Sequence, residues 1–328
     1  MNRVYNINGA ILTVNKAWCS ADMSPITLNC VRAKFKPGTS PHIRTSSSGY
    51  GADGAYLINE RDNIWDVYRN DTSWYALFIG DSNLLEVIGC NARGITDITV
   101  MCGDCSSLTK VNLTGLPNVT SLTQTFRYCY ALTDVTISDT SLNSINTSFK
   151  HCTSLTNVSI DTSAVTDFDY AFQGCTSLIT APNLDMSHAN STYAMFTNCS
   201  SLVNIPQYSS NMLTDASYMF YECSSLVTVP SFNFINLRTT VNMFADCTSL
   251  TALPAFSSAT LAKVSRTYGM FEGCINVESG IVDFYNSLIN KSGLVTYPVT
   301  DYARTFRDCG SNTTTGAAEL AQIPSDWK

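Results

Sequence analysis

The chain has 328 residues, enough for one large domain or two ordinary ones, and its 45% hydrophobic content suffices for a buried core. Only 14% of the residues are charged, while Ser, Thr and Asn together supply 103 residues. A net charge of −7 without clustered Lys and Arg argues against nucleic acid as a partner. No apolar run approaches the roughly 18 residues of a membrane span, and the first residues show neither a secretion signal nor a lipidation site.

Residues 1–77 differ in charge from the rest of the chain. They hold 8 of the 19 basic residues and 6 of the 26 acidic ones, so they are net positive while the remainder is net negative. Apolar stretches at 10–14, 26–36 and 55–58 predict strands. The Gly-, Pro- and Ser-rich stretch 36–54 is predicted to be a long loop. This part of the chain is therefore expected to be a small β-rich N-terminal module for capping or attachment.

Residues 63–78 (NIWDVYRNDTSWYALF) carry two Trp and two Tyr. A repeat protein must cover the exposed core of its first unit, so this segment is predicted to be an aromatic lid. The alternative is a ligand-binding platform.

Cysteines recur at a nearly constant interval from the middle of the chain onward. The spacings are 24, 23, 23, 24, 24, 24, 27 and 35 residues. Zinc sites need close pairs and disulfide frameworks are irregular, so a fixed period indicates a structural repeat. The cysteines of this series are Cys105, Cys129, Cys152, Cys175, Cys199, Cys223, Cys247, Cys274 and Cys309.

The repeat carries the motif F-x-x-C-x-x-L. Residues 78–84 (FIGDSNL) fit the same motif with Asp81 in the cysteine position, and Cys102 stands where one unit should have Phe. Phenylalanines that occupy the position three residues before a cysteine are Phe126, Phe149, Phe172, Phe196, Phe220, Phe244 and Phe271.

Further apolar positions in each unit predict its shape. An L-x-x-[VIL] pattern follows the cysteine and suits a short strand, and strands stacked from unit to unit form a parallel sheet on one face. The M-F-x-x-C segment is too short for a full helix and predicts a helical or 3₁₀ turn on the other face. Because so few apolar residues cannot close a core alone, the units must stack as a repeat solenoid.

This pattern resembles the BspA-like leucine-rich repeats first recognised in treponemal surface proteins. The M-F-x-x-C-x-S-L version is similar to repeats of mycoplasma surface lipoproteins and of proteins from gut anaerobes and their bacteriophages. The resemblance covers roughly residues 78–277. It implies a right-handed, shallowly curved solenoid that serves adhesion or recognition, and it does not imply an enzyme.

The cysteine column has two interpretations. A small buried thiol can fill a turn and bond weakly to backbone groups in each unit. Alternatively the column is a metal or redox ladder. Asp81 in one of the cysteine positions favours the structural interpretation. Cysteines that remain as reduced thiols suit a protein from an intracellular or anaerobic environment.

Residues 278–328 are predicted to be degenerate C-terminal repeats and a cap. They keep Phe306 and Cys309 and end near Trp327. Residues 282–293 are expected to form the one amphipathic helix of the chain.

No catalytic residue, metal site or cofactor is predicted. The three histidines, His42, His151 and His188, form no metal-binding pair. Cys152 beside His151 belongs to the repeat core, and the pair Cys102 and Cys105 is explained better by packing than by redox chemistry. Aspartates from Asp134 to Asp185 are scattered over variable positions.

The sequence therefore predicts a non-enzymatic recognition or structural module. The first hypothesis is a bacteriophage virion component, such as a fibre, receptor-binding or decoration protein, assembled as a homotrimer. Its partners would be a protein or surface glycan of a bacterial host, or other virion proteins. The alternatives are a bacterial surface adhesin of the BspA-like kind and, third, a hydrolase of surface glycans.

Exposed aromatic residues at variable repeat positions are the candidate binding residues, since aromatics dominate binding hot spots. Packing or solvated edges remain the other interpretation for each of them. The candidates are Tyr193, Tyr208, Tyr218, Tyr221 and Tyr268.

Overall fold

A computed structural model describes residues 3–6, 11–13, 29–46, 49–50, 55–61, 63–69, 72–138, 140–291 and 297–328. The chain forms two compact units, Met1–Asp161 (unit 1) and Thr162–Lys328 (unit 2). Each unit is a stack of repeat coils, as the sequence predicted.

Unit 1 begins with antiparallel strands. They are β1 (Arg3–Asn6), β2 (Ile11–Thr13), β3 (Asn29–Phe35), β6 (Ala55–Arg61) and β7 (Ile64–Arg69). The three strands predicted in this region are confirmed as β2, β3 and β6.

The stretch predicted as a long loop contains two short strands. β4 (Arg44–Ser46) pairs with β5 (Gly49–Tyr50) in a separate two-stranded sheet. The predicted aromatic lid is in part the strand β7, and its Trp74 is fully buried beside the first coil while Tyr75 is exposed.

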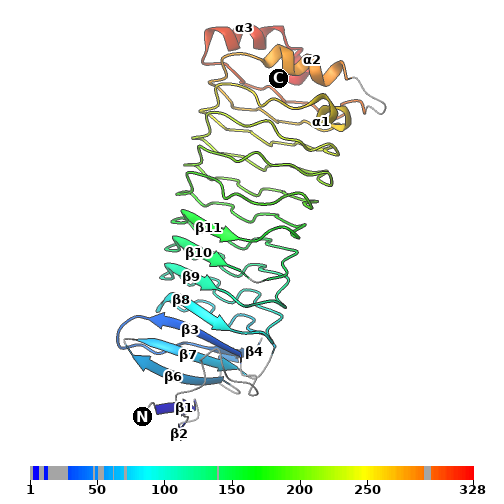
Figure 1. Cartoon of the computed structure of the whole chain (residues 1–328). Coiled ribbons are helices and arrows are strands. Elements are labelled where there is room, and N and C mark those ends of the chain that lie inside the picture. Colours follow the sequence, from blue (N-terminus) through cyan, green and yellow to red (C-terminus); the bar gives the residue numbers. More distant parts are fainter. Residues whose placement is uncertain are drawn as a thin grey trace. The chain divides into compact units, whose positions relative to one another are not determined.

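The coils of unit 1 add parallel strands to this sheet. β8 (Leu84–Asn91), β9 (Lys110–Leu113), β10 (Asp134–Ile137) and β11 (Asn157–Ile160) run parallel, with the valines of neighbouring coils in register. β3 pairs antiparallel with β8, which gives the order β11-β10-β9-β8-β3-β7-β6-β1-β2 (Figure 1). The N-terminal strands thus form one sheet with the first coils and cover the edge of β8, which would otherwise be unpaired.

In its described residues, unit 2 keeps the coils but not the strands. The corresponding positions form isolated parallel bridges, such as Thr180 with Asn204 and Ala252 with Ser279. Prolines stand seven residues after four of its cysteines, at Pro182, Pro206, Pro230 and Pro254. Proline cannot donate to a β-ladder. The expectation of a strand in every repeat is therefore wrong for the described coils of unit 2.

The opposite side of each coil is a run of turns, which we call the turn wall: the six residues that precede each cysteine position. Every second N–H bonds to the next coil, as in Phe126 to the Ser148 carbonyl at 3.0 Å. The others close turns three residues back, as in Cys129 to the Phe126 carbonyl at 3.2 Å. The wall therefore satisfies its own backbone without a sheet.

These turns close three residues back, as the predicted 3₁₀ turn does, but they alternate with bonds to the next coil and do not continue into a helix. Two residues of each wall lie in the left-handed region, at five and one residues before the cysteine position, such as Ala194 (φ 54°) and Asn198 (φ 58°). Asn, Asp and Gly tolerate this region, but Thr147 (φ 57°) is β-branched and strained there.

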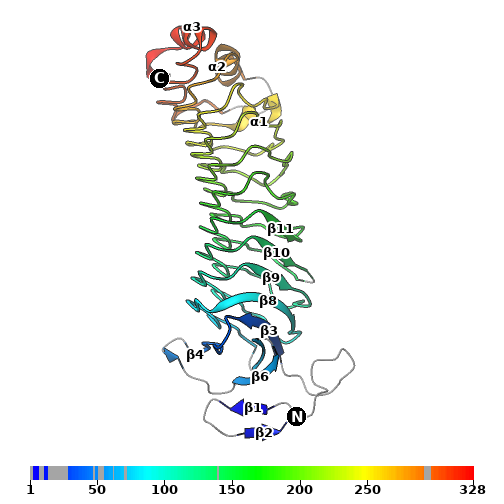
Figure 2. The same ribbon diagram turned by 90° about the vertical axis from the view of Figure 1, so that its left-hand side faces the viewer.

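The described residues of unit 2 form the α-helices α1 (Ser258–Lys263), α2 (Ile281–Ile289) and α3 (Thr314–Gln322) (Figure 2), followed by a short 3₁₀ helix, η1 (Ser325–Trp327). Only α2 matches the predicted helix at 282–293, and its expected end at Gly293 lies outside the described residues. The Glu319 carboxylate of α3 accepts hydrogen bonds from the first N–H groups of α2, at 2.8 Å from the Ile281 nitrogen. The ring of Phe284 packs edge-on against Phe271, so α2 covers the last coils.

Candidate functional site

The phenylalanines predicted for the ladder stack ring on ring inside each unit. Phe126 and Phe149 lie 5.6 Å apart in unit 1. In unit 2 the row runs from Phe172 through Phe196, Phe220 and Phe244 to Phe271 and Phe306, with centroids 5.3–6.0 Å apart. All of these rings are fully buried. They form the core that the repeat spacing requires.

Each ladder cysteine is buried in the turn that follows the Phe. The thiol donates to the preceding coil, as from Cys152 to the Phe126 carbonyl at 3.1 Å and from Cys223 to the Phe196 carbonyl at 3.2 Å. The same bond forms at Cys105, Cys129, Cys199, Cys247 and Cys274. Cys175 and Cys309 are buried as well.

Burial also makes these thiols unreactive. Desolvation raises the pKa of Cys102 and Cys105 well above the ordinary value, and it raises the pKa of Cys199 to about 12. Because the thiolate is the nucleophile and the metal ligand, this arrangement suits packing rather than redox or metal chemistry.

Asp81 occupies the cysteine position of the first coil for a different reason. One carboxylate oxygen accepts the His42 N–H at 2.9 Å, and the other accepts the Asn83 N–H at 2.8 Å. No coil precedes this one, so a thiol donor would lack its carbonyl, whereas the chain around His42 brings an N–H that needs an acceptor. The aspartate ties residues 41–43 to the first coil.

Three half-buried tyrosines meet on the turn wall of unit 2, and we call Tyr193, Tyr218 and Tyr221 the tyrosine strip. The ring centroids of Tyr193 and Tyr218 lie 5.4 Å apart, and those of Tyr218 and Tyr221 lie 5.7 Å apart at 79°. Tyr170 continues the row, 5.3 Å from Tyr193. Three of the five predicted binding residues thus lie together.

Four half-buried carboxylates surround the tyrosine strip: Asp169, Asp215, Glu222 and Asp246. One oxygen of Asp169 accepts the Tyr193 N–H at 2.8 Å and the Ser191 hydroxyl at 2.5 Å. Burial, and after it the hydrogen bond and charge of Glu222, raises the pKa of Tyr221 to about 12. Among the described residues none of the four carboxylates forms an ion pair.

Burial raises the pKa of Asp169, and the neighbouring charges of Asp167 and Asp215 add to that effect. Burial likewise raises the pKa of Asp246, followed by the charges of Glu272 and Glu222. The surface around the strip therefore concentrates negative charge without a compensating cation from residues 151–237, which contain no Lys or Arg.

Tyr208 does not belong to this surface, and its prediction as an exposed binding residue is wrong. Its side chain is 2% exposed, its hydroxyl donates to the Pro182 carbonyl at 2.8 Å, and its ring stacks on Phe196 and Phe232. The position nine residues after the cysteine is a second core column, which continues through Phe232 to Phe256.

Tyr268 lies on the turn wall of a later coil and already faces a cation. The Arg304 guanidinium carbon is 5.7 Å from the ring centroid of Tyr268, and Arg304 donates to the Tyr268 hydroxyl at 3.0 Å. Arg304 also forms an ion pair with Glu272.

The turn wall of unit 1 carries a similar internal pair. The Arg127 guanidinium carbon lies 5.9 Å from the ring centroid of Tyr128, the His151 ring stacks on Tyr128 at 5.2 Å, and the Tyr130 ring lies 6.2 Å away. Arg127 donates to the Gln124 side chain at 2.6 Å and stands 3.7 Å from Asp104.

A polar column eight residues before each cysteine position was not anticipated. Its side chains accept the N–H two residues on and so begin the turn wall, as in Asp97 to Thr99 at 2.9 Å and Asp215 to Ser217 at 2.8 Å. The signal in the sequence is the recurrence of Ser and Asp at this offset, which favours such turns.

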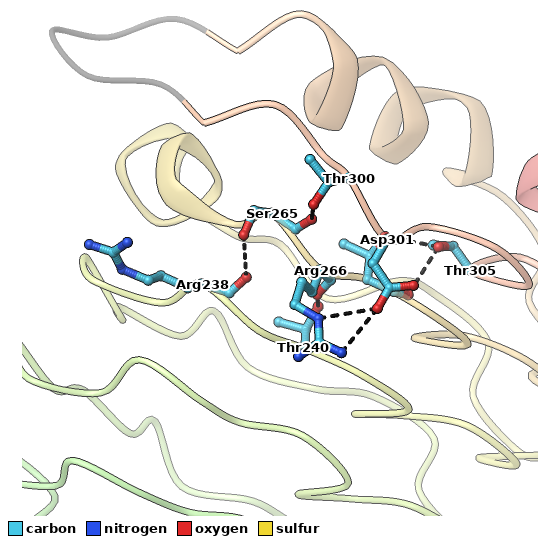
Figure 3. A network of polar contacts seen from close by, with 8 residues as sticks. Arg238, Thr240, Ser265, Arg266, Thr300, Asp301 and Thr305 are labelled. Atoms are coloured by element: carbon cyan, nitrogen blue, oxygen red, sulfur yellow. Dashed lines mark hydrogen bonds and ion pairs between the residues drawn. The ribbon is translucent and has the colours of Figure 1, made fainter.

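In the last coils two charged residues that form an ion pair occupy the positions of this polar column. Arg266 and Asp301 meet between neighbouring coils at 3.1 Å (Figure 3). Hydroxyl groups tie the same coils together nearby, with Thr240 donating to the Arg266 carbonyl at 3.2 Å and Thr305 lying 2.9 Å from the Thr267 hydroxyl. Both charged groups are exposed, so the pair contributes little to stability.

The arrangement around the histidines does not suit catalysis. His42 and His188 are exposed, and His151 stacks on Tyr128 while the neighbouring Cys152 thiol bonds to a backbone carbonyl. No group of three or more His, Cys, Asp or Glu in the described part of the chain could hold a metal ion. Nor is any described helix long and apolar enough to cross a membrane.

The sequence matches the BspA type leucine-rich repeat region in six copies, over residues 100–186, 120–251 and 192–291. The chain belongs to the BspA-type leucine-rich repeat family. The repeat solenoid fold predicted from the sequence is thereby confirmed. A search of curated proteins finds no match.

Two solved structures are similar to this BspA-type chain. One is a leucine-rich repeat protein from Bacteroides ovatus, with 16% identity, a TM-score of 0.29, and 78% of this chain and 83% of that chain covered. The other is a leucine-rich cell surface protein from Faecalibacterium prausnitzii, with 18% identity, a TM-score of 0.30, and coverages of 88% and 99%. At these TM-scores neither likeness carries an argument.

Proposed function

We propose that this chain is a non-enzymatic recognition module whose contact surface is the tyrosine strip of unit 2. The supporting observation is that Tyr193, Tyr218 and Tyr221 meet on one wall, half-buried against each other and beside carboxylates. Tyrosine supplies a large contact area at low conformational entropy cost. Repeat proteins in general bind partners through such extended surfaces.

The binding test compares purified full-length chain with a Tyr193→Ala, Tyr221→Ala double variant on cells of bacteria from the source material. We expect the double variant to lose at least about tenfold in affinity, as for paired hot-spot residues. Tyr130→Ala is the matched control, because Tyr130 is an exposed tyrosine of unit 1, 48% accessible. Equal binding by the double variant and the native chain would contradict the proposal.

Where the module acts is a separate part of the proposal. Membership of a repeat family known from surface proteins favours an outer bacterial surface, and the virion placement remains the competing prediction. Mass spectrometry of density-purified bacteriophage particles and of the cell-envelope fraction distinguishes them. Stoichiometric recovery with capsid proteins would assign the virion, and recovery with the envelope alone would assign the cell surface.

The homotrimer also remains a prediction. Light scattering on the purified chain tests it, and a monomer at micromolar concentration would contradict it.

A further inference from the structure

Two tyrosines on other turn walls, one in unit 1 and one in the last coils, face cations that the chain itself supplies. In the last coils Tyr268 stands six residues before its cysteine and Arg304 five residues before the next one, and the two side chains meet. In unit 1 Arg127 lies over Tyr128. The preference is physical, because the negative face of an aromatic ring attracts a cation.

The tyrosine strip repeats the first of these arrangements without the cation. Tyr193 and Tyr218 occupy the same two positions of successive coils as Tyr268 and Arg304, so a second tyrosine stands where the later coil has arginine. Glu222 and Asp246 lie one residue before their cysteines and carry charge towards Tyr221.

The four carboxylates around the strip are of one sign, and the cation that acts on them is Arg304 of a later coil, at Asp246. Asp169 and Asp215 lie at the Tyr193 end, and Glu222 and Asp246 lie at the Tyr221 end. Residues 151–237 supply no Lys or Arg, and Arg304, in the later coil, is already paired with Glu272 and Tyr268. Like charges held close together destabilise one another, and an external cation would relieve that repulsion.

From these contacts we infer that the tyrosine strip binds a cationic segment of a protein partner, a stretch that presents Lys or Arg side chains. The inference rests on the proposed recognition role of the same surface. The ring faces of Tyr193, Tyr218 and Tyr221 take the alkyl stems and cationic heads, as Tyr268 takes Arg304 within the chain. Glu222 and Asp246 at one end, and Asp169 and Asp215 at the other, pair with the ammonium or guanidinium groups.

The test is calorimetry of the full-length chain with a hexalysine peptide, with its fully acetylated form as the neutral control. We expect the charged peptide alone to bind. A Glu222→Gln, Asp246→Asn double variant should weaken binding by roughly tenfold, and raised salt should weaken it further. Asp185→Asn is the matched control, because Asp185 is an exposed carboxylate away from the turn wall and its removal should leave binding unchanged.

A second variant tests the internal precedent. Arg304→Gln frees Tyr268 and Glu272 and should lengthen the acidic aromatic surface, so hexalysine should bind more tightly than to the native chain. Unchanged folding of each variant is checked by its melting temperature.

The pH dependence gives an independent reading. The pKa of Asp169, which faces Asp167 and Asp215, is raised, and so is the pKa of Asp246, which faces Glu222, Glu272 and Arg304. Both groups therefore take up protons at a higher pH than an ordinary aspartate. Hexalysine binding should be full at neutral pH and should weaken as the pH falls, before ordinary aspartates are protonated.

The outcomes distinguish the inferred cationic partner from the proposed recognition role on which it rests. Equal binding of hexalysine and its acetylated form, or no effect of the Glu222→Gln, Asp246→Asn double variant, would overturn the cationic partner. If the tyrosine double variant still lost binding to bacterial cells, the recognition role would stand with a different ligand, such as a neutral glycan. If the variants lost neither hexalysine binding nor binding to bacterial cells, both the cationic partner and the recognition role would be overturned.

Discussion

The coils of unit 1 and unit 2 share one side and differ on the other. Both build the turn wall, stack a phenylalanine in each coil, and bond a buried thiol to the preceding coil. Unit 1 completes its coils with the parallel strands β8–β11, whereas unit 2 has prolines and isolated bridges there. The wall and its core are thus the constant frame, and the strand is an addition that a coil can lack.

The outer surfaces of the two walls differ in a parallel way. The unit 1 wall covers Tyr128 with its own Arg127 and His151. The wall of unit 2 leaves Tyr193, Tyr218 and Tyr221 among carboxylates. One backbone frame therefore carries a self-paired tyrosine at Tyr128 of unit 1 and at Tyr268 of unit 2, and an acidic aromatic surface at the tyrosine strip.

The largest effect is expected from the shared core. Phe126→Ala in unit 1 and Phe220→Ala in unit 2 should each lower the free energy of unfolding by about 3–5 kcal/mol, because each leaves a cavity in a stacked row. Denaturant unfolding measures both. If only one of the two variants lost unfolding free energy, the claim that both units share the same core would be contradicted.

The next effect concerns the one cysteine position that holds an acid. Asp81→Ala leaves the His42 and Asn83 N–H groups without their acceptor and should cost about 2–4 kcal/mol. Cys223→Ala loses only a weak thiol bond and a small volume, so about 1 kcal/mol is expected. If the Asp81→Cys variant had the same free energy of unfolding as the native chain, the claimed difference between the first coil and the cysteine-containing coils would be contradicted.

Backbone strain in the turn wall should give effects of about 1 kcal/mol in opposite directions. Gly273→Ala places a Cβ 2.3 Å from the Asp246 side chain at φ +70° and should destabilise the chain. Thr147→Gly removes a β-branched residue from φ 57° and should stabilise it slightly. Melting temperatures of both variants check this, and destabilisation by Thr147→Gly would show that its hydroxyl bond to Asn146 outweighs the strain.

The smallest effect is expected at the prolines. Pro230→Thr restores a donor where unit 1 has strand residues, yet its change in unfolding free energy should stay within about 0.5 kcal/mol because the wall holds the coil without a ladder. Hydrogen exchange should show slower amides in β9 and β10 than at the bridges of unit 2. Equally slow amide exchange in β9 and β10 and at the bridges of unit 2 would contradict the difference between the strands of unit 1 and the bridges of unit 2.

The frame could be predicted from the sequence because its residues recur at fixed spacing. Cysteine, Phe and Leu repeat about every 24 residues, and that spacing alone implies stacked coils. The left-handed turn before the cysteine has a signal in Gly80, Gly174 and Gly273, but Tyr128, Thr147 and Glu222 at such turns carry no glycine, so the turns were not recognised as a feature of every repeat. α3 was not predicted although its AAELAQ segment has high helix propensity and Thr313 caps its first turn, where Gly316 packs close to the Val277 carbonyl.

The fixed spacing of the repeat also allowed part of the binding surface to be predicted from the sequence. Tyr193, Tyr218 and Tyr221 fall on the wall, where side chains reach solvent, but Tyr208, predicted as exposed with them, is buried. The recurrence of aromatics at Tyr208, Phe232 and Phe256 marks a buried column, and periodicity would have separated it from the strip. Glu222 and Asp246 recur one residue before their cysteines and Asp215 belongs to the polar column, but only the fold shows that these carboxylates lie beside the tyrosines.

Hydrogen–deuterium exchange of the full-length chain with and without hexalysine tests the central claim most directly, because it compares the two walls in one experiment. The account predicts added protection at residues 193–198 and 217–222 of unit 2, and none at residues 123–128 and 146–151 of unit 1. Protection of the unit 1 wall, or of neither wall under saturating peptide, would contradict it.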